Sequence, residues 1–140
     1  MSGVLYTTEI LRLAASTGSC ARLANPTGTS EKRSPICGSR VAVDVLLDGQ
    51  GRVAAIGQEV RACALGQAAA ALMERSAFGK SAIELAAARD DLRNWLSGRS
   101  EKPPNWPGLN IFEPARAHSA RHPAILLAFD AAAEAAGPKP

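Results

Sequence analysis

The fold is decided by residues 40–73, which read RVAVDVLLDGQGRVAAIGQEVRACALGQAAAALM. Valine or leucine recurs at every second position of residues 41–47, which is the period of a half-buried β-strand, and Asp44 is among the residues that face the other way. An Asp-Gly pair then predicts a hairpin turn, after which residues 52–62 resume a strand pattern. The alanine-rich run that follows favours a helix. Two antiparallel strands and a helix are therefore expected here.

The sheet is expected to have two or three strands and to begin directly after Cys37. Gly57 lies in the middle of the second strand pattern, where it predicts a bulge or a break into two strands. Residues 17–39 are rich in Gly, Ser, Thr and Pro and are read as an irregular loop at the site. We expect an α+β fold, with a three-stranded antiparallel sheet and helices packed on one face. The 140 residues have room for a single domain, at 1–140.

Patterns typical of helices precede and follow these strands in the sequence. Ser81 and Glu84 form a capping-box pattern, and a Pro-rich connection, interpreted as an insertion, occupies residues 98–114. Residues 137–140 should fray. The expected helices are residues 4–15, 63–78, 81–97, which Gly98 ends, and a last helix that starts near His122-Pro123 and runs to 136.

Composition and missing motifs exclude several classes of function. The net charge of +3 comes from scattered arginines and only 4% of the residues are aromatic, so we expect no nucleic-acid partner. No GxSxG, phosphate-loop or HExxH motif is present, so nothing indicates a hydrolase or a nucleotide enzyme. Glu9 and Arg12 interrupt the stretch where a signal peptide would be apolar, and no run is long enough to span a membrane. A cytoplasmic protein without a membrane partner is expected.

The three cysteines are the main chemical signal. Cys20, Cys37 and Cys63 are an odd number, and in a reducing compartment they favour metal binding or thiol chemistry over disulfides. Cys37 precedes the first predicted strand and Cys63 follows the last one at a helix start, so a meander can bring them to one end of the sheet. Thiolates select zinc, cuprous copper and iron–sulfur clusters. The alternative, that each cysteine is a small inert buried residue, stays open.

Two histidines are further candidates. His118 and His122 are four residues apart, so on one continuous helix they would share a face and could chelate a metal. Pro123 instead indicates that His122 stands at the start of the helix. A loop or capping role for each histidine therefore stays open.

Several short motifs, taken in order, resemble a known family. They are Pro35-Ile36-Cys37-Gly38 before a valine-rich strand, Cys63 at the start of an alanine-rich helix, Gly79-Lys80-Ser81 before the next helix, and Arg121 ahead of Leu127-Ala128-Phe129. In this order they resemble the IscU/SufU/NifU N-terminal scaffold of iron–sulfur cluster assembly. The resemblance runs from about residue 5 to residue 136. The Pro-rich connection is similar to the insertion of the SufU-type branch.

The resemblance implies a set of ligand positions. Cys37 matches the family's first cysteine ligand and Cys63 matches the second. Ser39 stands where the family has aspartate, and Ala124 stands where it has the third cysteine. His122 is the nearest substitute ligand. His118, Cys20, or cysteines from a second protomer are further alternatives.

The function that the resemblance implies is a scaffold or carrier, without enzymatic activity of its own. It would bind iron, an iron–sulfur cluster or transferred sulfur through Cys37 and Cys63, with His122 as a metal ligand and zinc as an alternative metal. A cysteine desulfurase and cluster-accepting proteins are the implied partners. Two other functions stay open, a metal-free paralogue that acts as a protein-binding module and a sulfur transferase that accepts a persulfide.

Overall fold

The centre of the molecule is an antiparallel sheet whose strands are hydrogen-bonded in chain order. The computed structural model describes residues 6–16, 21–35 and 38–137. Its strands are β1 (Gly28–Arg33), β2 (Arg40–Leu47) and β3 (Val53–Arg61). The predicted turn joins β2 to β3, where the Asp48 carboxylate accepts hydrogen bonds from the amides of Gln50 and Arg52 at 2.8 and 3.0 Å. The three-stranded antiparallel sheet is confirmed.

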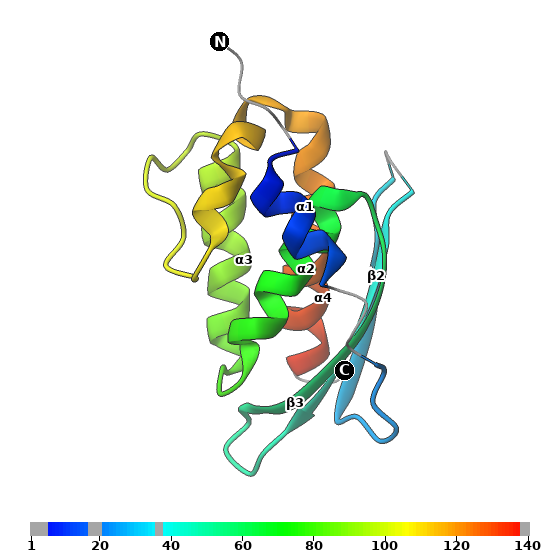
Figure 1. Cartoon of the computed structure of the whole chain (residues 1–140). Coiled ribbons are helices and arrows are strands. Elements are labelled where there is room, and N and C mark those ends of the chain that lie inside the picture. Colours follow the sequence, from blue (N-terminus) through cyan, green and yellow to red (C-terminus); the bar gives the residue numbers. More distant parts are fainter. Residues whose placement is uncertain (1–5, 17–20, 36–37, 138–140) are drawn as a thin grey trace.

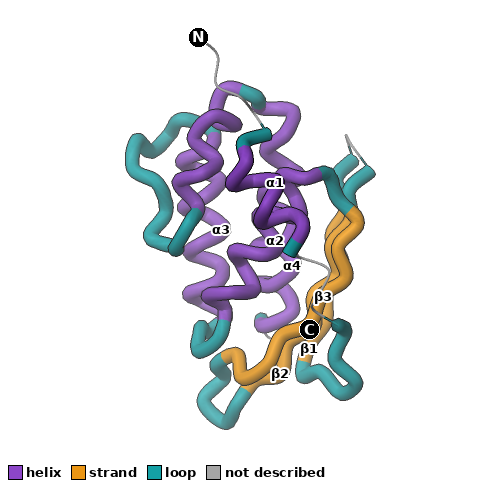
Figure 2. Tube along the Cα trace, viewed as in Figure 1, coloured by secondary structure: helices purple, strands orange, loops and turns teal. Residues whose placement is uncertain are grey.

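The helices cover one face of this sheet. They are α1 (Thr8–Ala15), α2 (Ala64–Ala77), α3 (Ala82–Leu96) and α4 (His122–Ala136), with the 3-10 helices η2 (Leu109–Ala117) and η3 (Ser119–Arg121) before α4. Helix α4 packs against β1 and β2, α2 packs against β3, α3 lies against α4, and α1 lies against α2. Figures 1 and 2 show the helices on a single side of the strands, which confirms the predicted α+β architecture.

The inward face of β2 is the centre of the core. Val41, Val43 and Val45 are completely buried beneath the helices. Each such side chain stabilises the fold by roughly 1.5–3 kcal/mol relative to an exposed one. The helical layer above them contributes Ala128 and Phe129, which are also completely buried. The alternating valines in the sequence therefore correctly identify the face of β2 that is buried against the helices.

Strand β1 was not predicted, because residues 17–39 were interpreted as an irregular loop. Its sequence, GTSEKR, lacks the apolar alternation of a strand. It is stabilised by pairing with β2 and by contacts to α4, where the Glu134 carboxylate accepts a hydrogen bond from Ser30 Oγ at 2.6 Å and lies 2.7 Å from Lys32 Nζ. Because polar contacts hold this edge strand, its sequence does not need the alternating apolar residues by which a strand is recognised. The interpretation of this stretch as a loop was wrong from Gly28 to Arg33.

Gly57 does not divide β3, which is one continuous strand through Arg61. Residues 21–24, called here the strap, cross the outer face of the sheet above this glycine. A Cβ atom at Gly57 would clash with the carbonyl oxygen of Ala21, so only glycine leaves room for the strap. The predicted break into two strands is wrong. The sheet's third strand is β1 instead.

The Pro-rich connection is irregular only as far as Gly108, and η2 follows it. Leu109 and Phe112 of η2 are completely buried, which accounts for the ordered turns there. The Arg116 guanidinium holds this segment to the end of α3 by donating hydrogen bonds to the carbonyl oxygens of Trp95 at 2.8 Å and Ser100 at 3.1 Å. The prediction of an irregular connection through residue 114 therefore fails from Leu109 onward.

Candidate functional site

Cys63 stands between the end of β3 and the first turn of α2. It is the N-cap residue of the helix, with extended backbone angles (φ −64°, ψ 172°), and its carbonyl accepts a hydrogen bond from the Gln67 amide at 2.9 Å. The half-buried side chain makes no capping hydrogen bond. The prediction that Cys63 opens this helix is confirmed. Its sulfur is attached at the positive end of the helix dipole, which favours negative charge.

The start of α4 lies against the first turn of α2. A Cβ atom on Gly66 would lie 3.2 Å from the carbonyl oxygen of Ala124 and 2.7 Å from the Cβ atom of Ala62, so glycine is needed for this approach. Ala124 is buried, with 1% of its surface exposed. The structure thus brings Ala124 beside the helix that Cys63 caps, and this position carries a methyl group that cannot bind a metal.

His122 begins α4, as predicted, and is half-buried. Its Nε2 atom lies 2.9 Å from the carbonyl oxygen of Ala115. A carbonyl oxygen can only accept, so Nε2 carries a proton in this contact, and the tautomer that has this hydrogen bond places its lone pair on Nδ1. Histidine ligands commonly have this arrangement, with one ring nitrogen held by a backbone carbonyl and the other free for a metal.

His118 is not on the same helix as His122. It lies between η2 and η3, with φ −116° and ψ 77°, and it is exposed. The two histidines therefore do not share one helical face. The metal-chelating pair considered from their spacing is not formed by a helix.

Ser39, the residue that the resemblance places at the family's acidic position, lies directly before β2. Ser39 is buried, with 4% of its surface exposed, and its carbonyl oxygen accepts a hydrogen bond from the Ser34 amide at 2.8 Å. Cys37 and Cys20 lie outside the described residues. The expected proximity of Cys37 to Cys63 therefore stays a prediction.

The donor set around Cys63 is short of a complete metal site. Within residues 6–16, 21–35 and 38–137, no group of three or more His, Cys, Asp or Glu side chains is close enough to hold a metal ion. A tetrahedral site needs four ligands, or three and an exogenous group. Cys63 supplies one thiol, and Ala124 supplies no donor. The described residues alone therefore do not fit a resident metal.

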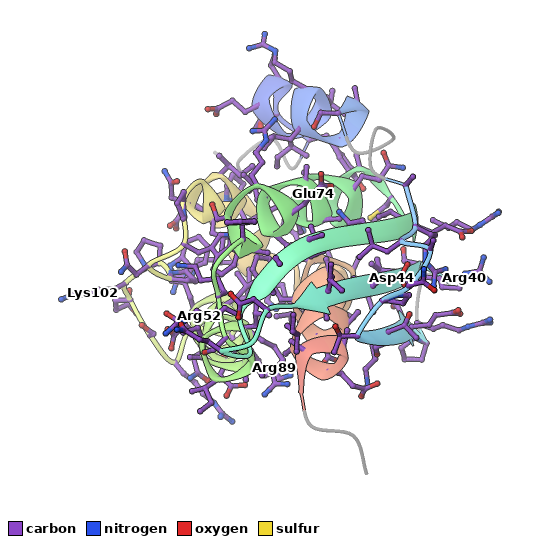
Figure 3. The ribbon with its side chains drawn as sticks, turned by 90° about the horizontal axis from the view of Figure 1, so that it is seen from below. Arg40, Asp44, Arg52, Glu74, Arg89 and Lys102 are labelled. Atoms are coloured by element: carbon purple, nitrogen blue, oxygen red, sulfur yellow. The ribbon has the colours of Figure 1, made fainter. Side chains whose placement is uncertain are left out.

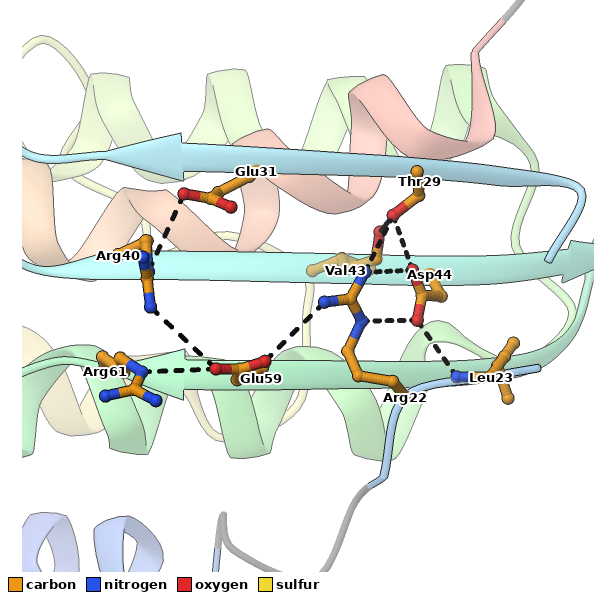
Figure 4. Close-up of polar contacts among 9 residues, drawn as sticks. All are labelled: Arg22, Leu23, Thr29, Glu31, Arg40, Val43, Asp44, Glu59 and Arg61. Carbon is orange, nitrogen blue, oxygen red and sulfur yellow. Dashed lines mark hydrogen bonds and ion pairs between the residues drawn. The ribbon is translucent and has the colours of Figure 1, made fainter. Parts of the chain in front are cut away.

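The outer face of the sheet carries a polar network that sequence reasoning missed (Figure 4). Asp44 is buried there, with 1% of its surface exposed. Arg22 of the strap binds both of its carboxylate oxygens, at 2.6 and 2.9 Å, while Thr29 Oγ1 and the Leu23 amide donate to it at 2.5 and 3.0 Å. The hydrogen bond from Arg22 is the main reason why the pKa of Asp44 falls to about 2. An aspartate on the outward face of a central strand indicates that a basic residue pairs with it, but the sequence alone does not show that this residue is Arg22.

Comparison with family models and with curated proteins gives no match. Solved structures do match. The N-terminal part of a nitrogen-fixing NifU-like protein from Brucella abortus is 37% identical, with a TM-score of 0.85 over 94% of this chain and 91% of that one. A protein described as an iron–sulfur cluster assembly scaffold for the SUF system, from Fervidobacterium islandicum AW-1, has a TM-score of 0.84. It is 22% identical, over 95% of this chain and 97% of that one, a level that shows the fold alone.

The fold defines an α+β domain of the NifU/SufU-like class. At 37% identity over 94% of its length, the chain belongs to the family of NifU-like proteins, N-terminal type. The resemblance inferred from the short motifs is confirmed. No helix in the described part of the chain is both long enough and apolar enough to cross a membrane.

Proposed function

We propose that this protein is a scaffold or carrier in iron–sulfur cluster assembly and that Cys63 is its central binding residue. The observation that carries the proposal is the placement of Cys63 at the start of α2, against the start of α4. The fold is shared with a protein described as a cluster assembly scaffold. The partners in this proposal are a cysteine desulfurase and cluster-accepting proteins, in the cytoplasm, and the protein has no enzymatic activity of its own.

Iron or a nascent cluster is the cargo, and Cys37, Cys63 and His122 are its proposed ligands. His122 is suited to this role because its Nε2–H is held by the Ala115 carbonyl, which leaves Nδ1 as the ligand atom. Zinc is the alternative metal, since sulfur and imidazole donors suit both ions. Three ligands leave the fourth position to an exogenous group.

Transferred sulfur is the second candidate cargo, and the methyl group of Ala124 favours it. Sulfur transfer needs only one accessible thiolate, so it tolerates the loss of a metal ligand. The Cys63 thiolate would attack the outer sulfur of a persulfide on the desulfurase. The sulfur–sulfur bond of the donor then breaks, its thiolate leaves, and Cys63 carries the new persulfide. One sulfur–sulfur bond replaces another, so no external oxidant is needed.

Anaerobic loading of the protein tests both forms of the proposal. The protein is incubated with ferrous iron and sulfide, and bound iron and acid-labile sulfide are measured after desalting. We expect Cys63→Ser and His122→Ala to lose most of the bound iron and the exposed His118→Ala to keep it. Iron that stays bound in Cys63→Ser would exclude the metal site.

Sulfur loading is measured separately, with a desulfurase and cysteine followed by alkylation and mass spectrometry. A persulfide on Cys63 without retained iron would assign the sulfur-carrier role. A protein that takes up neither cargo would be a metal-free binding module, and the carrier proposal would fail.

A further inference from the structure

The outer face of the sheet ends in a row of arginines, one from each strand. Arg33 of β1 pairs with Arg40 of β2, and Arg40 pairs with Arg61 of β3. We call these residues the arginine row. Figure 3 shows Arg40 at one end of the sheet and Arg52 at the other, and Figure 4 places Arg40 and Arg61 on the face that carries Asp44. Like charges directly opposite one another on neighbouring strands are destabilising, so the row has a cost for the free protein.

The positive charge of this row is only partly neutralised by the protein itself. Two carboxylates, those of Glu31 and Glu59, serve its three guanidinium groups. The ion pairs are Arg33 Nε–Glu31 Oε2 at 3.1 Å, Arg40 Nε–Glu31 Oε2 at 3.7 Å, Arg40 Nη2–Glu59 Oε2 at 3.9 Å and Arg61 Nε–Glu59 Oε2 at 3.2 Å.

The row also has many hydrogen-bond donors available to a ligand. A guanidinium has five N–H donors. Arg33 and Arg61 each donate one hydrogen bond, to Glu31 and Glu59, and their side chains are 70% and 69% exposed. In the part of the chain that the structure describes, the Arg40 side chain makes ion pairs but no hydrogen bond of its own. Most of the donors of Arg33 and Arg61 therefore face solvent, whereas the Arg40 side chain is 32% exposed.

We infer that the arginine row is the docking site for an acidic segment of a partner protein. Neighbouring strands are about 4.8 Å apart, so the row spans roughly 10 Å across the sheet. Carboxylates at positions i, i+4 and i+7 of a helix span about 10 Å along one face. An acidic helix lying across the strands can therefore present one carboxylate to each of Arg33, Arg40 and Arg61, and bidentate pairing with guanidinium groups gives such contacts their geometric specificity.

The surroundings of the row favour a protein segment over a nucleic acid. The three arginines form a single row, and the next outward-facing positions of β1 and β3 carry Glu31 and Glu59. A phosphate backbone carries one negative charge on every nucleotide, and the phosphates beyond this single row would meet these carboxylates. None of the three strands contains an aromatic residue on which a base could stack.

The position of the row relates the docking site to the chemistry of the protein. Arg61 is the last residue of β3, and Cys63 follows two residues later as the cap of α2. A partner bound to the row would lie beside the segment that leads to this thiol. Only this link between the docking site and Cys63 rests on the proposed function. The docking itself depends on the charge and spacing of the arginines.

Peptide binding tests the docking site without any metal or sulfur. The probe is a fluorescein-labelled, alanine-based helical peptide with glutamates at i, i+4 and i+7, and its affinity is measured by fluorescence anisotropy at low ionic strength. We expect the triple variant R33Q/R40Q/R61Q to bind about tenfold more weakly, because several exposed ion pairs are lost together. The double variant R33Q/R61Q changes only the two most exposed side chains and should show part of this loss while keeping the fold.

A matched control removes the same charge elsewhere. The variant R12Q/R75Q/R93Q changes exposed arginines of α1, α2 and α3, and it should bind the peptide within about twofold of the parent protein. Equal weakening by both triple variants would overturn the inference, as would equally tight binding of a glutamine version of the peptide or of an oligonucleotide of the same charge. Cys63→Ala should bind the peptide normally, so a failure of the docking site is distinguishable from a failure of the proposed function.

Discussion

Helices α2 and α3 begin in opposite ways. At the start of α3, Ser81 Oγ accepts a hydrogen bond from the Glu84 amide at 3.2 Å, and the Glu84 carboxylate accepts one from the Ser81 amide at 3.0 Å. At the start of α2, the Cys63 side chain makes no such bond. The first arrangement satisfies the helix start with the chain's own side chains. The second leaves a thiol where a cap would stabilise the helix, so the candidate site lies where the chain forgoes that stabilisation.

Placing a cysteine at position 124 should have the largest effect on this comparison. We expect Ala124→Cys to raise the affinity for zinc by at least about tenfold, because the new thiolate can bind the metal directly. Losing a residue that only hydrogen-bonds to a metal ligand already costs about that much. The measurement is a competition titration against a chelator of known zinc affinity. The extra ligand would sharpen the contrast between the start of α2, which would bind a metal, and the start of α3, which is capped by the chain's own side chains.

The control for this variant is Ala128→Cys, one turn further along α4 and also buried. It adds the same number of thiols away from the start of the helix. An equal gain in zinc affinity from Ala128→Cys would show that position 124 is not special.

Removing the cap of α3 should cost stability without affecting the site. We expect Ser81→Ala to lower the free energy of unfolding by about 1 kcal/mol, because the Glu84 amide in the first turn loses the Ser81 hydroxyl as its acceptor. Urea denaturation measures this change. Cargo loading at Cys63 should be unchanged, and a parallel loss of loading would mean that the two helix starts are coupled.

Adding a cap to α2 should have the opposite sign. We expect Cys63→Ser to raise the free energy of unfolding by about 0.5 kcal/mol, because serine is a preferred N-cap residue and cysteine forms no cap here. The gain is reduced because Cys63 also packs against the core. The same variant should lose its cargo. A destabilised Cys63→Ser protein would contradict the view that this position is kept for function.

The smallest expected effect is the loss of stability at the start of α3 when the pH is lowered. The hydrogen bond from the Ser81 amide is the main reason why the pKa of Glu84 is lowered in the folded protein. A lowered pKa stabilises the fold above the pKa of the unfolded chain, and this contribution is lost as the pH falls through the folded value. The free energy of unfolding should therefore fall more steeply with acid in the parent protein than in Glu84→Gln. Identical pH profiles would remove Glu84 from this role.

The elements with strong local signals were predictable from the sequence. Alternating valines located β2, an alanine run located α2, and the Ser81–Glu84 pattern located the start of α3. Strand β1 was missed because its residues are polar and its pairing partner lies farther along the chain. Gly57 was misread because the need for glycine comes from the strap, a segment more than thirty residues away.

The candidate site was predictable only in part. The position of Cys63 at a helix start follows from local pattern, whereas the approach of Ala124 to Gly66 depends on how α2 and α4 pack. The hydrogen bond from His122 to Ala115 depends on the path of η2 and η3. Contacts of this kind are tertiary, and no periodicity in a single sequence encodes them.

The strap has a consequence for the order of folding. Its contact between Arg22 and Asp44 joins residues 22 positions apart. The surface that it covers, made of Asp44 on β2 and Gly57 on β3, exists only after these two strands have paired. We therefore expect docking of the strap to follow formation of the hairpin, and its contacts to be absent from an early transition state. In stopped-flow measurements, Arg22→Ala should accelerate unfolding and leave the refolding rate nearly unchanged, whereas equal changes in both rates would place the strap in the folding nucleus.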